Sequence, residues 1–505
     1  MSPRLPSGRT DIVSYALVRL IDQPQTPLSE WYRVMGLACL VATNSPDVLA
    51  AARAVFREMM PPQPGADFTL RFWVDPAAHG SGQPSQARFR GLNHLVCAQF
   101  DDAGAMLLDL RRRRALGRFS PALAADAAYW QRVVLPNAVG LMSEALGLTA
   151  LHCASVEKEG RGLLMAGGSG AGKSTLSLAL ARRGFAFLSD DWTYFSHANG
   201  RLRAWHIATP IKLLPDAVRF FPELSTLEPH VSLNGEVAYE ADPEGVFGVR
   251  RSLECEPRWL VFVERRSEPG HCLVRLGPEE AAARLEHELE ELPEELSAVS
   301  ARQSGTVLEL AGRECWSLAY GGSPDEAAEV LARFCAESTQ HGEPRPAPNP
   351  GGPPRFRRAG PDILRRFTPT PLTADFDSDL ETGGGAIRLQ TNSAAILRHV
   401  SGTLRPAGAA PRHRFLWRLV ADDESASDAG GGQLQTGGAA RIPGWRADGL
   451  YFESTAEGSF LVVDTEARLA VGFFSPALVN DAAQFQRQVV VPLISGTGSR
   501  FVGSL

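Results

Sequence analysis

Hydrophobic and polar residues follow two different periods along the chain, and each period predicts a different kind of element. Short apolar runs bounded by turn residues predict strands, as in residues 95–100 and 105–110, which flank the turn sequence DDAG. Over residues 124–147 the apolar positions recur at helical spacing, which predicts a helix with a kink at Pro136 and an end at Gly147. The first part of the chain therefore reads as strands closed by a helix.

Two further runs lie in the middle of the chain. Residues 257–265 (PRWLVFVER) predict a buried strand. Residues 278–296 are acidic and amphipathic, and they predict a helix whose charges form a solvated face.

The pattern repeats at a long interval. Residues 117–136 (GRFSPALAADAAYWQRVVLP) match residues 472–491 (GFFSPALVNDAAQFQRQVVV) at 12 of 20 positions. Earlier segments match in the same order: 41–49 with 389–397, 70–76 with 415–422, and 93–110 with 448–465. Because the matches are collinear, we expect a duplicated domain and not a short solenoid repeat.

The repeat divides the chain into four predicted regions. These are a first copy of the mainly β (α+β) domain at 1–147, a central domain at 148–338, a linker rich in Pro, Gly and Arg at 339–365, and a second copy at 366–505. The predicted class is α/β, with the central domain flanked by the two copies. Pairing of the copies within one chain and homo-oligomerisation through them both remain open.

Composition excludes several classes of protein. Of 505 residues 44% are hydrophobic and 21% charged, and the net charge is −6, so we expect no nucleic-acid partner. No apolar run is long enough for a membrane helix, and the start does not read as a signal peptide. The seven cysteines are scattered without a CxxC pair, which argues against disulfides and zinc and favours the cytoplasm.

One segment carries a specific chemical signal. Residues 167–174 (GGSGAGKS) fit the pattern G-x-x-x-x-G-K-[ST], between a predicted strand at 161–166 and a predicted helix at 173–183. Such a loop surrounds phosphate oxygens with backbone N–H groups, and the helix presents its positive end to the same anion. Lysine is scarce in this chain, at three of 51 basic residues, which makes Lys173 informative. The predicted nucleotide-binding residues are Gly167, Gly168, Ser169, Gly170, Ala171, Gly172, Lys173, Ser174 and Thr175. We call residues 167–174 the phosphate loop.

Two adjacent acids, Asp190 and Asp191, follow a short predicted strand at 185–189. The carboxyl end of a strand is where ligands bind in α/β sheets. Neighbouring side chains on an extended backbone point in different directions, so one acid can approach Mg²⁺ while the other faces an acceptor hydroxyl. Asp191, with the Ser174 hydroxyl, is our candidate metal ligand, although the sequence leaves the two acids interchangeable.

Residues 151–191 (LHCASVEKEGRGLLMAGGSGAGKSTLSLALARRGFAFLSDD) resemble the catalytic core of HPr kinase/phosphorylase and its serine-kinase-like relatives, and PEP carboxykinase shares the same order of elements. The resemblance implies that ATP and Mg²⁺ bind at the phosphate loop, with Lys173, Asp190 and Asp191 catalytic. It also implies that His152 lies near the transferring phosphate. The chain departs from the family at Cys153 and Thr175, which leaves the acceptor open.

The expected function is therefore ATP-dependent phosphorylation of a hydroxyl, with serine of a protein or peptide as the expected acceptor. A regulatory ATP-binding module without phosphotransfer and a small-molecule kinase remain alternatives. Lys212, Arg250 and Arg251 are candidates for an additional cation near the phosphates. The run RRRR at 111–114 is interpreted as a solvated strand end.

Overall fold

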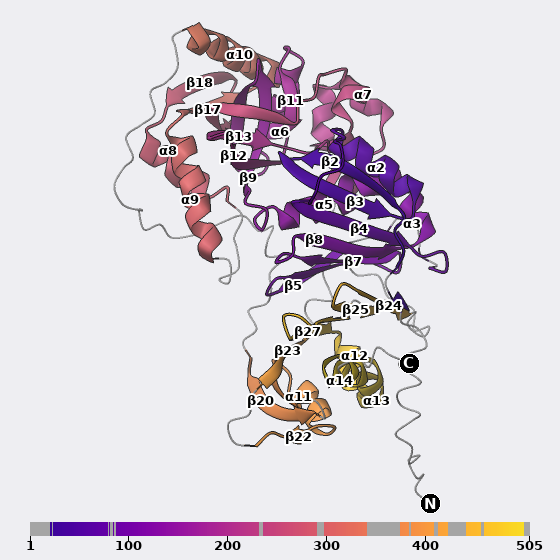
Figure 1. The fold of residues 1–505 in the computed structure, drawn as a ribbon. Helices are drawn as coiled ribbons and strands as arrows, with labels where there is room; N and C mark the ends of the chain where they lie inside the picture. Colours follow the sequence, from indigo (N-terminus) through magenta and orange to yellow (C-terminus); the bar gives the residue numbers. More distant parts are fainter. Residues whose placement is uncertain are drawn as a thin grey trace, which may run out of the picture.

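A computed structural model describes residues 21–22, 24–78, 80, 84, 87–231, 236–289, 297–340, 374–382, 385–408, 413–422, 441–455 and 459–498. Several sheets combine with helices, so the mixed α/β class predicted from the sequence is confirmed. Figure 1 shows the indigo N-terminal sheet between a magenta central part and an orange-to-yellow C-terminal part. The predicted linker falls mostly outside the described residues.

The N-terminal part is a seven-stranded sheet in the order β2-β3-β4-β8-β7-β6-β5. The pairs β3–β4 and β4–β8 are parallel, and the other pairs are antiparallel. The predicted hairpin over residues 95–110 is present as β6 and β7. Its elements are β2 (Leu28–Val34), β3 (Leu37–Thr43), α2 (Pro46–Phe56), β4 (Phe68–Val74), β5 (Ala87–Leu92), β6 (Leu95–Phe100), β7 (Gly104–Asp109), β8 (Arg114–Phe119), α3 (Pro121–Ala125), α4 (Ala127–Tyr129), η1 (Trp130–Val134) and α5 (Leu135–Met142).

The helical segment after β8 differs from the prediction. The sequence predicts one helix over 124–147, kinked at Pro136, but the structure has a break at Asp126 and the last helix, α5, ends at Met142. Ser120 and Asp126 each accept a hydrogen bond from a backbone N–H three residues later, so the chain is capped twice and restarts. From α4 onward the backbone stays helical, and Pro136 comes directly after the wider π-helical turn η1.

The C-terminal part has the same strand order as the N-terminal part. Its sheet runs β24-β25-β26-β27-β23-β21-β20, with β22 beyond β20 and β1 (Ile21–Asp22) beyond β24. Again two neighbouring pairs, β21–β23 and β23–β27, are parallel. The elements are β20 (Phe376–Thr382), β21 (Gly385–Thr391), α11 (Ala394–Ser401), β22 (Arg405–Pro406), β23 (His413–Ala421), β24 (Arg441–Ala447), β25 (Leu450–Thr455), β26 (Phe460–Asp464), β27 (Leu469–Phe474), α12 (Pro476–Asn480), α13 (Ala482–Phe485), η8 (Gln486–Val490) and α14 (Val491–Gly498).

The two sheets contact each other through apolar faces. One buried cluster joins the outer face of the N-terminal sheet, for example Leu107 and Leu116, to the face of the C-terminal sheet that carries Trp445 and Val462. Strand β1, from the start of the chain, also pairs with β24 in parallel. The N-terminal and C-terminal parts are therefore held together by a continuous hydrophobic contact.

Arginines from 111–114 bridge the same contact, so their interpretation as a solvated strand end was wrong. The Arg112 guanidinium lies 2.7 Å from Asp109, 2.8 Å from Asp464 and 2.6 Å from Glu466. Arg114 Nη2 donates to the backbone carbonyl of Asp448. The arginines thus form contacts between the two parts. This role explains why the matching residues of the second copy, 466–469 (EARL), need not carry the same charges.

The central part, residues 149–340, surrounds the phosphate loop. Its sheet runs β10-β9-β12-β13-β17-β19-β18, β11 pairs with β9, and β10 also pairs with β17 in parallel. The predicted strands at 161–166, 185–189 and 257–265 are present. The elements are β9 (Thr149–Lys158), β10 (Arg161–Ala166), α6 (Lys173–Ala181), β11 (Ala186–Ser189), β12 (Trp192–Ala198), β13 (Arg201–Trp205), β14 (Ile211–Leu213), η2 (Pro215–Arg219), η3 (Pro222–Thr226), β15 (His230–Val231), β16 (Val237–Ala241), α7 (Pro243–Phe247), β17 (Glu254–Arg265), β18 (Gly270–Arg275), α8 (Pro278–Glu286), α9 (Ser297–Ala311), β19 (Glu314–Gly321) and α10 (Pro324–Gln340).

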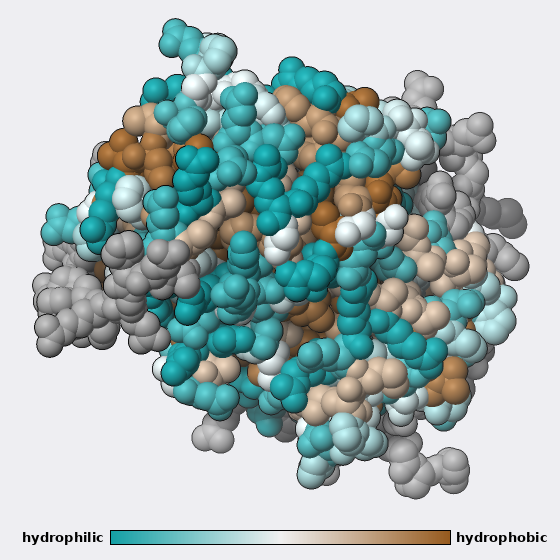
Figure 2. Space-filling view, turned by 90° about the horizontal axis from the view of Figure 1, so that it is seen from above, coloured by the Kyte–Doolittle hydropathy of each residue, from teal (hydrophilic) through white to brown (hydrophobic). Residues whose placement is uncertain are grey.

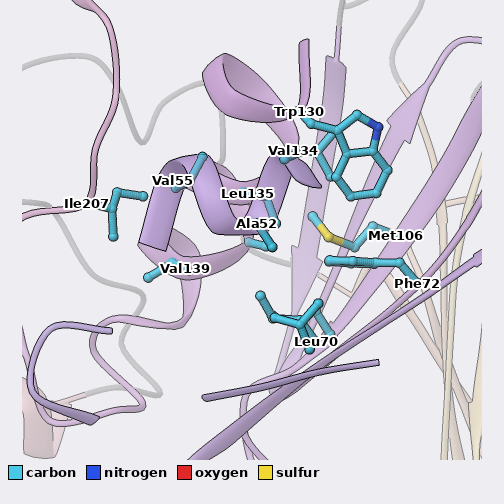
Figure 3. Close-up of a cluster of buried hydrophobic side chains, with 14 of the residues drawn as sticks. Ala52, Val55, Leu70, Phe72, Met106, Trp130, Val134, Leu135, Val139 and Ile207 are labelled. Carbon is cyan, nitrogen blue, oxygen red and sulfur yellow. The ribbon is translucent and has the colours of Figure 1, made fainter. Parts of the chain in front are cut away.

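The central part is packed firmly against the N-terminal part. Ile207 and Trp205 belong to the same buried cluster as Val55 and Val139, and Figure 3 shows Ile207 facing these two residues. The N–H of Ala208 donates to the carbonyl of Val55 at 2.9 Å. This core is continuous across the two parts and therefore fixes the central part against the N-terminal part.

The molecular surface has no uniform hydropathy on the face that Figure 2 shows. On the face shown in Figure 2, hydrophilic and hydrophobic residues are interspersed. Within the described ranges, every helix is too short or too polar to cross a bilayer.

Candidate functional site

The phosphate loop connects β10 to α6, as the sequence predicted. The backbone at Gly172, the residue before α6, has φ +89°, a conformation that favours glycine. A Cβ atom at Gly172 would overlap the hydroxyl of Tyr320, so this position also lacks space for any side chain. At the other end of the loop, a Cβ on Gly167 would clash with the carbonyl oxygen of Val263. The motif glycines thus allow the loop to lie close to β17 and β19.

Lys173 begins α6 and is almost fully buried. Its ammonium donates hydrogen bonds to the carbonyl oxygens of Gly167 and Gly168. The loop therefore encloses the Lys173 ammonium. A bound phosphate would compete with the two carbonyl oxygens for the hydrogen bonds of this ammonium. Ser174, the next residue, turns its hydroxyl toward Asp190.

Asp190 follows β11 and is buried, with 6% of its surface exposed. It accepts a hydrogen bond from the backbone N–H of Lys212 at 2.9 Å, and the Ser174 hydroxyl lies near the same carboxylate. Burial and the nearby Asp191 charge raise the pKa of Asp190 to about 7, and the hydrogen bond from Lys212 opposes this rise. The structure thus places one predicted acid near the predicted metal-binding serine.

Asp191 is half exposed and turns to the other side, toward His152 on β9. Its Oδ1 lies 2.9 Å from Nε2 of His152, while Nδ1 of the same ring lies 3.4 Å from Oε2 of Glu288. Burial lowers the pKa of His152, but the bonds to Asp191 and Glu288 outweigh this and raise it to about 9. Loss of hydration raises the pKa of Asp191, yet the imidazolium dominates and lowers it below its ordinary value. At neutral pH the pair is therefore an ion pair.

The interpretation of residues 278–296 as one helix with a solvated acidic face was wrong at Glu288. The helix α8 ends at Glu286, and Glu288 is buried with 8% exposure. Its backbone carbonyl accepts the N–H of His152 at 2.9 Å, and Leu289 forms a bridge to Leu151. This contact could not be predicted from the sequence, because a strand-like pairing interrupts the acidic periodicity. Residues 290–296 lie outside the described residues.

The additional cations predicted from sequence do not face the loop. Arg250 donates to the carbonyl of Gly184, beyond the far end of α6. Arg251 donates to the carbonyl of Thr209. Lys212 contributes its backbone N–H to Asp190, while its ammonium lies 2.7 Å from Glu236. Lys212 thus meets Asp190 through its main chain, and its ammonium charge helps to lower the pKa of Asp191.

A cleft of about 220 Å³ opens beside the first glycine of the loop. Its walls come from the end of β17, the end of α8 and β19. The lining residues are Gly167, Phe262, Val263, Glu264, Arg284, His287, Glu288 and Ser317. Since Glu288 lines the cleft and also contacts His152, the cleft is connected to the acid pair by two side-chain contacts.

The donor set fits Mg²⁺ used together with phosphate. In the part of the chain that the structure describes, no group of three or more His, Cys, Asp and Glu side chains is arranged around a metal position. Mg²⁺ in nucleotide sites usually takes only one or two protein oxygens, with phosphate and water completing its shell. The Ser174 hydroxyl and the Asp190 carboxylate supply such a pair.

Comparisons with known proteins give a weak structural match. No family model and no curated protein matches the chain. A similar solved structure is the HPr(Ser) kinase/phosphatase from Coxiella burnetii, with 14% identity and a TM-score of 0.21. The match covers 38% of this chain and 98% of that one. A likeness of this size carries no argument about activity, which depends on the residues of the site.

Proposed function

We propose that the protein is an ATP-dependent phosphotransferase that phosphorylates a hydroxyl group, with serine of a protein or peptide as the acceptor. The observation that carries this proposal is that the phosphate loop encloses the Lys173 ammonium, and that the next residue, Ser174, lies near Asp190, beside Asp191. The loop supplies backbone donors and Lys173 for the phosphates, and the acids supply the two functions that phosphoryl transfer requires.

The two acids divide these functions by their surroundings. Asp190 is buried and lies near Ser174, so we assign it to Mg²⁺ together with Ser174, in place of Asp191. When bound, Mg²⁺ would neutralise phosphate charge. Asp191 is half exposed and can reach an incoming hydroxyl, so we assign it as the general base.

His152 supports Asp191 in this assignment. The imidazolium fixes one carboxylate oxygen through its Nε2–H and leaves the other oxygen able to accept the proton of the acceptor hydroxyl. Glu288 holds the ring from the opposite side. His152 is thus a positioning residue for the base, and it keeps positive charge near the phosphate end of the loop.

The cleft beside Gly167 supports an acceptor that inserts a small group. Its volume of about 220 Å³ suits one or two side chains of a peptide, and its wall includes both charged and apolar residues. The N-terminal and C-terminal parts would then hold the central part and present the acceptor. A regulatory ATP-binding module and a small-molecule kinase use the same loop, and no further contact favours either of them.

Phosphotransfer from γ-labelled ATP tests the proposal. The full chain with Mg²⁺ is incubated with a serine-containing degenerate peptide library, and label in the peptides is measured. Transfer in the native protein that disappears in Asp191→Asn supports phosphorylation. ATP binding without any transfer favours the regulatory module, and transfer to small hydroxyl compounds alone favours a small-molecule kinase.

A further inference from the structure

The hydroxyl of Tyr320, near the end of β19, is buried against the phosphate loop. The residue is 1% exposed; the Arg265 guanidinium approaches its hydroxyl, but among the described residues the hydroxyl has no hydrogen-bond partner of normal geometry. Because a Cβ at Gly172 would overlap this oxygen, the hydroxyl lies directly on the backbone before Lys173. A buried hydroxyl without a partner costs about 1–3 kcal/mol, so a donor placed here is expected to serve a ligand.

Arg265, the last residue of β17, reaches the same glycine from the neighbouring strand. Its Nη1 lies 3.7 Å from the Cβ position of Gly172. The guanidinium is held near two aromatic rings, at 5.7 Å from the centroid of Phe220 and 5.8 Å from that of Tyr320. Stacking of this kind fixes a guanidinium without neutralising it.

The adjacent residue, Arg266, differs from Arg265 because it is exposed and paired with a carboxylate. Its Nε lies 3.6 Å from Oε1 of Glu264, and its side chain is 56% exposed. Within the described residues Arg265 forms no ion pair with a carboxylate within 4 Å, so its charge is available at the loop.

Two donors from parallel strands therefore converge on the N-terminal end of α6, where the backbone is kept bare by glycine. We infer that Arg265 and Tyr320 contact the phosphate groups of the nucleotide held by the phosphate loop, an inference that rests on the proposed function. A planar guanidinium suits phosphate oxygens better than a point charge does. The pair replaces Arg250 and Arg251 as the additional cation of the site.

The test compares nucleotide affinity in matched variants of the full chain. Dissociation constants for Mg-ATP and Mg-ADP are measured by calorimetry for Arg265→Gln, Arg265→Lys, Tyr320→Phe and the control Arg266→Gln. We expect Arg265→Gln to weaken ATP binding by roughly tenfold or more, Arg265→Lys to weaken it less, and Arg266→Gln to change it by less than about twofold.

Tyr320→Phe separates a ligand contact from a structural role. Since the buried hydroxyl has no hydrogen bond of normal geometry to lose within the described residues, we expect an equal or higher Tm without nucleotide and an affinity for ATP lower by roughly threefold. A lower Tm with unchanged affinity overturns the assignment of Tyr320.

The two proposals fail in distinguishable ways. If the native chain binds ATP and both Arg265 variants bind it equally well, the inference is overturned and the proposed function stands. If the native chain binds no ATP, both are overturned. Should Arg265→Gln lower the Tm strongly, Arg265→Lys, which retains the charge, decides the outcome.

Discussion

Nε2 of His152 lies 2.9 Å from Oδ1 of Asp191, and the other nitrogen of the same ring faces Glu288. The histidine is thus held between two carboxylates, one half exposed beside the phosphate loop and one buried. This relationship distinguishes Asp191 from Asp190, which lies near Ser174 instead. Two adjacent residues of one type have been given different surroundings and can perform different tasks.

Replacing each of the two acids in turn by asparagine should separate these tasks. Asp191→Asn is expected to retain Mg-ATP binding and to lower the transfer rate by about 10²–10⁴, because the base is lost. Asp190→Asn is expected to weaken the Mg²⁺ dependence of ATP binding, because a metal ligand is lost. Calorimetry at several Mg²⁺ concentrations and transfer kinetics measure both effects. Full transfer by Asp191→Asn would contradict the assigned roles.

The stability of the ligand-free chain should depend on pH through His152. Its pKa is raised from 6.5 to about 9, so the ion pair stabilises the folded state fully below pH 6.5. This contribution is lost as the pH rises from about 6.5 through 9. The Tm difference between the native chain and His152→Gln should therefore shrink over that range. A difference that stays constant from pH 6 to pH 9.5 would show that folding does not raise the pKa of His152.

The contact between the two sheets should depend on Arg112. This side chain joins Asp109 of one sheet to Asp464 of the other, and Asp464 is fully buried. Replacing Arg112 by methionine leaves the buried Asp464 carboxylate with His94 and two backbone N–H groups, so we expect the loss of one charged partner to cost about 1.5–3 kcal/mol. Differential scanning calorimetry should show a lower Tm for Arg112→Met. Arg33→Met, which removes an exposed ion pair with Glu58, is the control and should change little.

Gly172 should tolerate no side chain. Its backbone has φ +89°, and a Cβ atom would overlap the hydroxyl of Tyr320. Gly172→Ala is expected to weaken ATP binding by more than about tenfold, because the loop must shift at the phosphate site. Gly168→Ala, with open space around the Cβ position, is the matched control and should bind more tightly than Gly172→Ala. Equal affinities in the two variants would mean that the loop is pliable at Gly172.

The elements around the phosphate loop could be predicted from sequence because their signals are local. An apolar run, a glycine-rich turn and a helix follow one another within residues 161–181, and the residue types of each segment predict its backbone conformation without reference to distant residues. The same is true of the hairpin over residues 95–109, where a turn sequence separates two apolar runs.

The remaining site residues could not be predicted because they meet across distant strands. Glu288 reaches His152 through a pairing between segments 136 residues apart, and its acidic neighbours suggested a solvated helix. Arg265 and Tyr320 converge on Gly172 because β17 and β19 are parallel neighbours, a property of the sheet and not of either segment. Arg112 appeared solvated for the same reason, since its partner Asp464 lies in the other sheet.

Calorimetric titration of the full chain with ATP in the presence of Mg²⁺, with Lys173→Ala alongside, tests the central claim most directly. The account predicts saturable binding to the native protein at one site per chain, and at least tenfold weaker binding to Lys173→Ala, because the buried ammonium contributes charge-assisted hydrogen bonds to phosphate. Absence of heat in the native protein, or equal affinity in the variant, would contradict it.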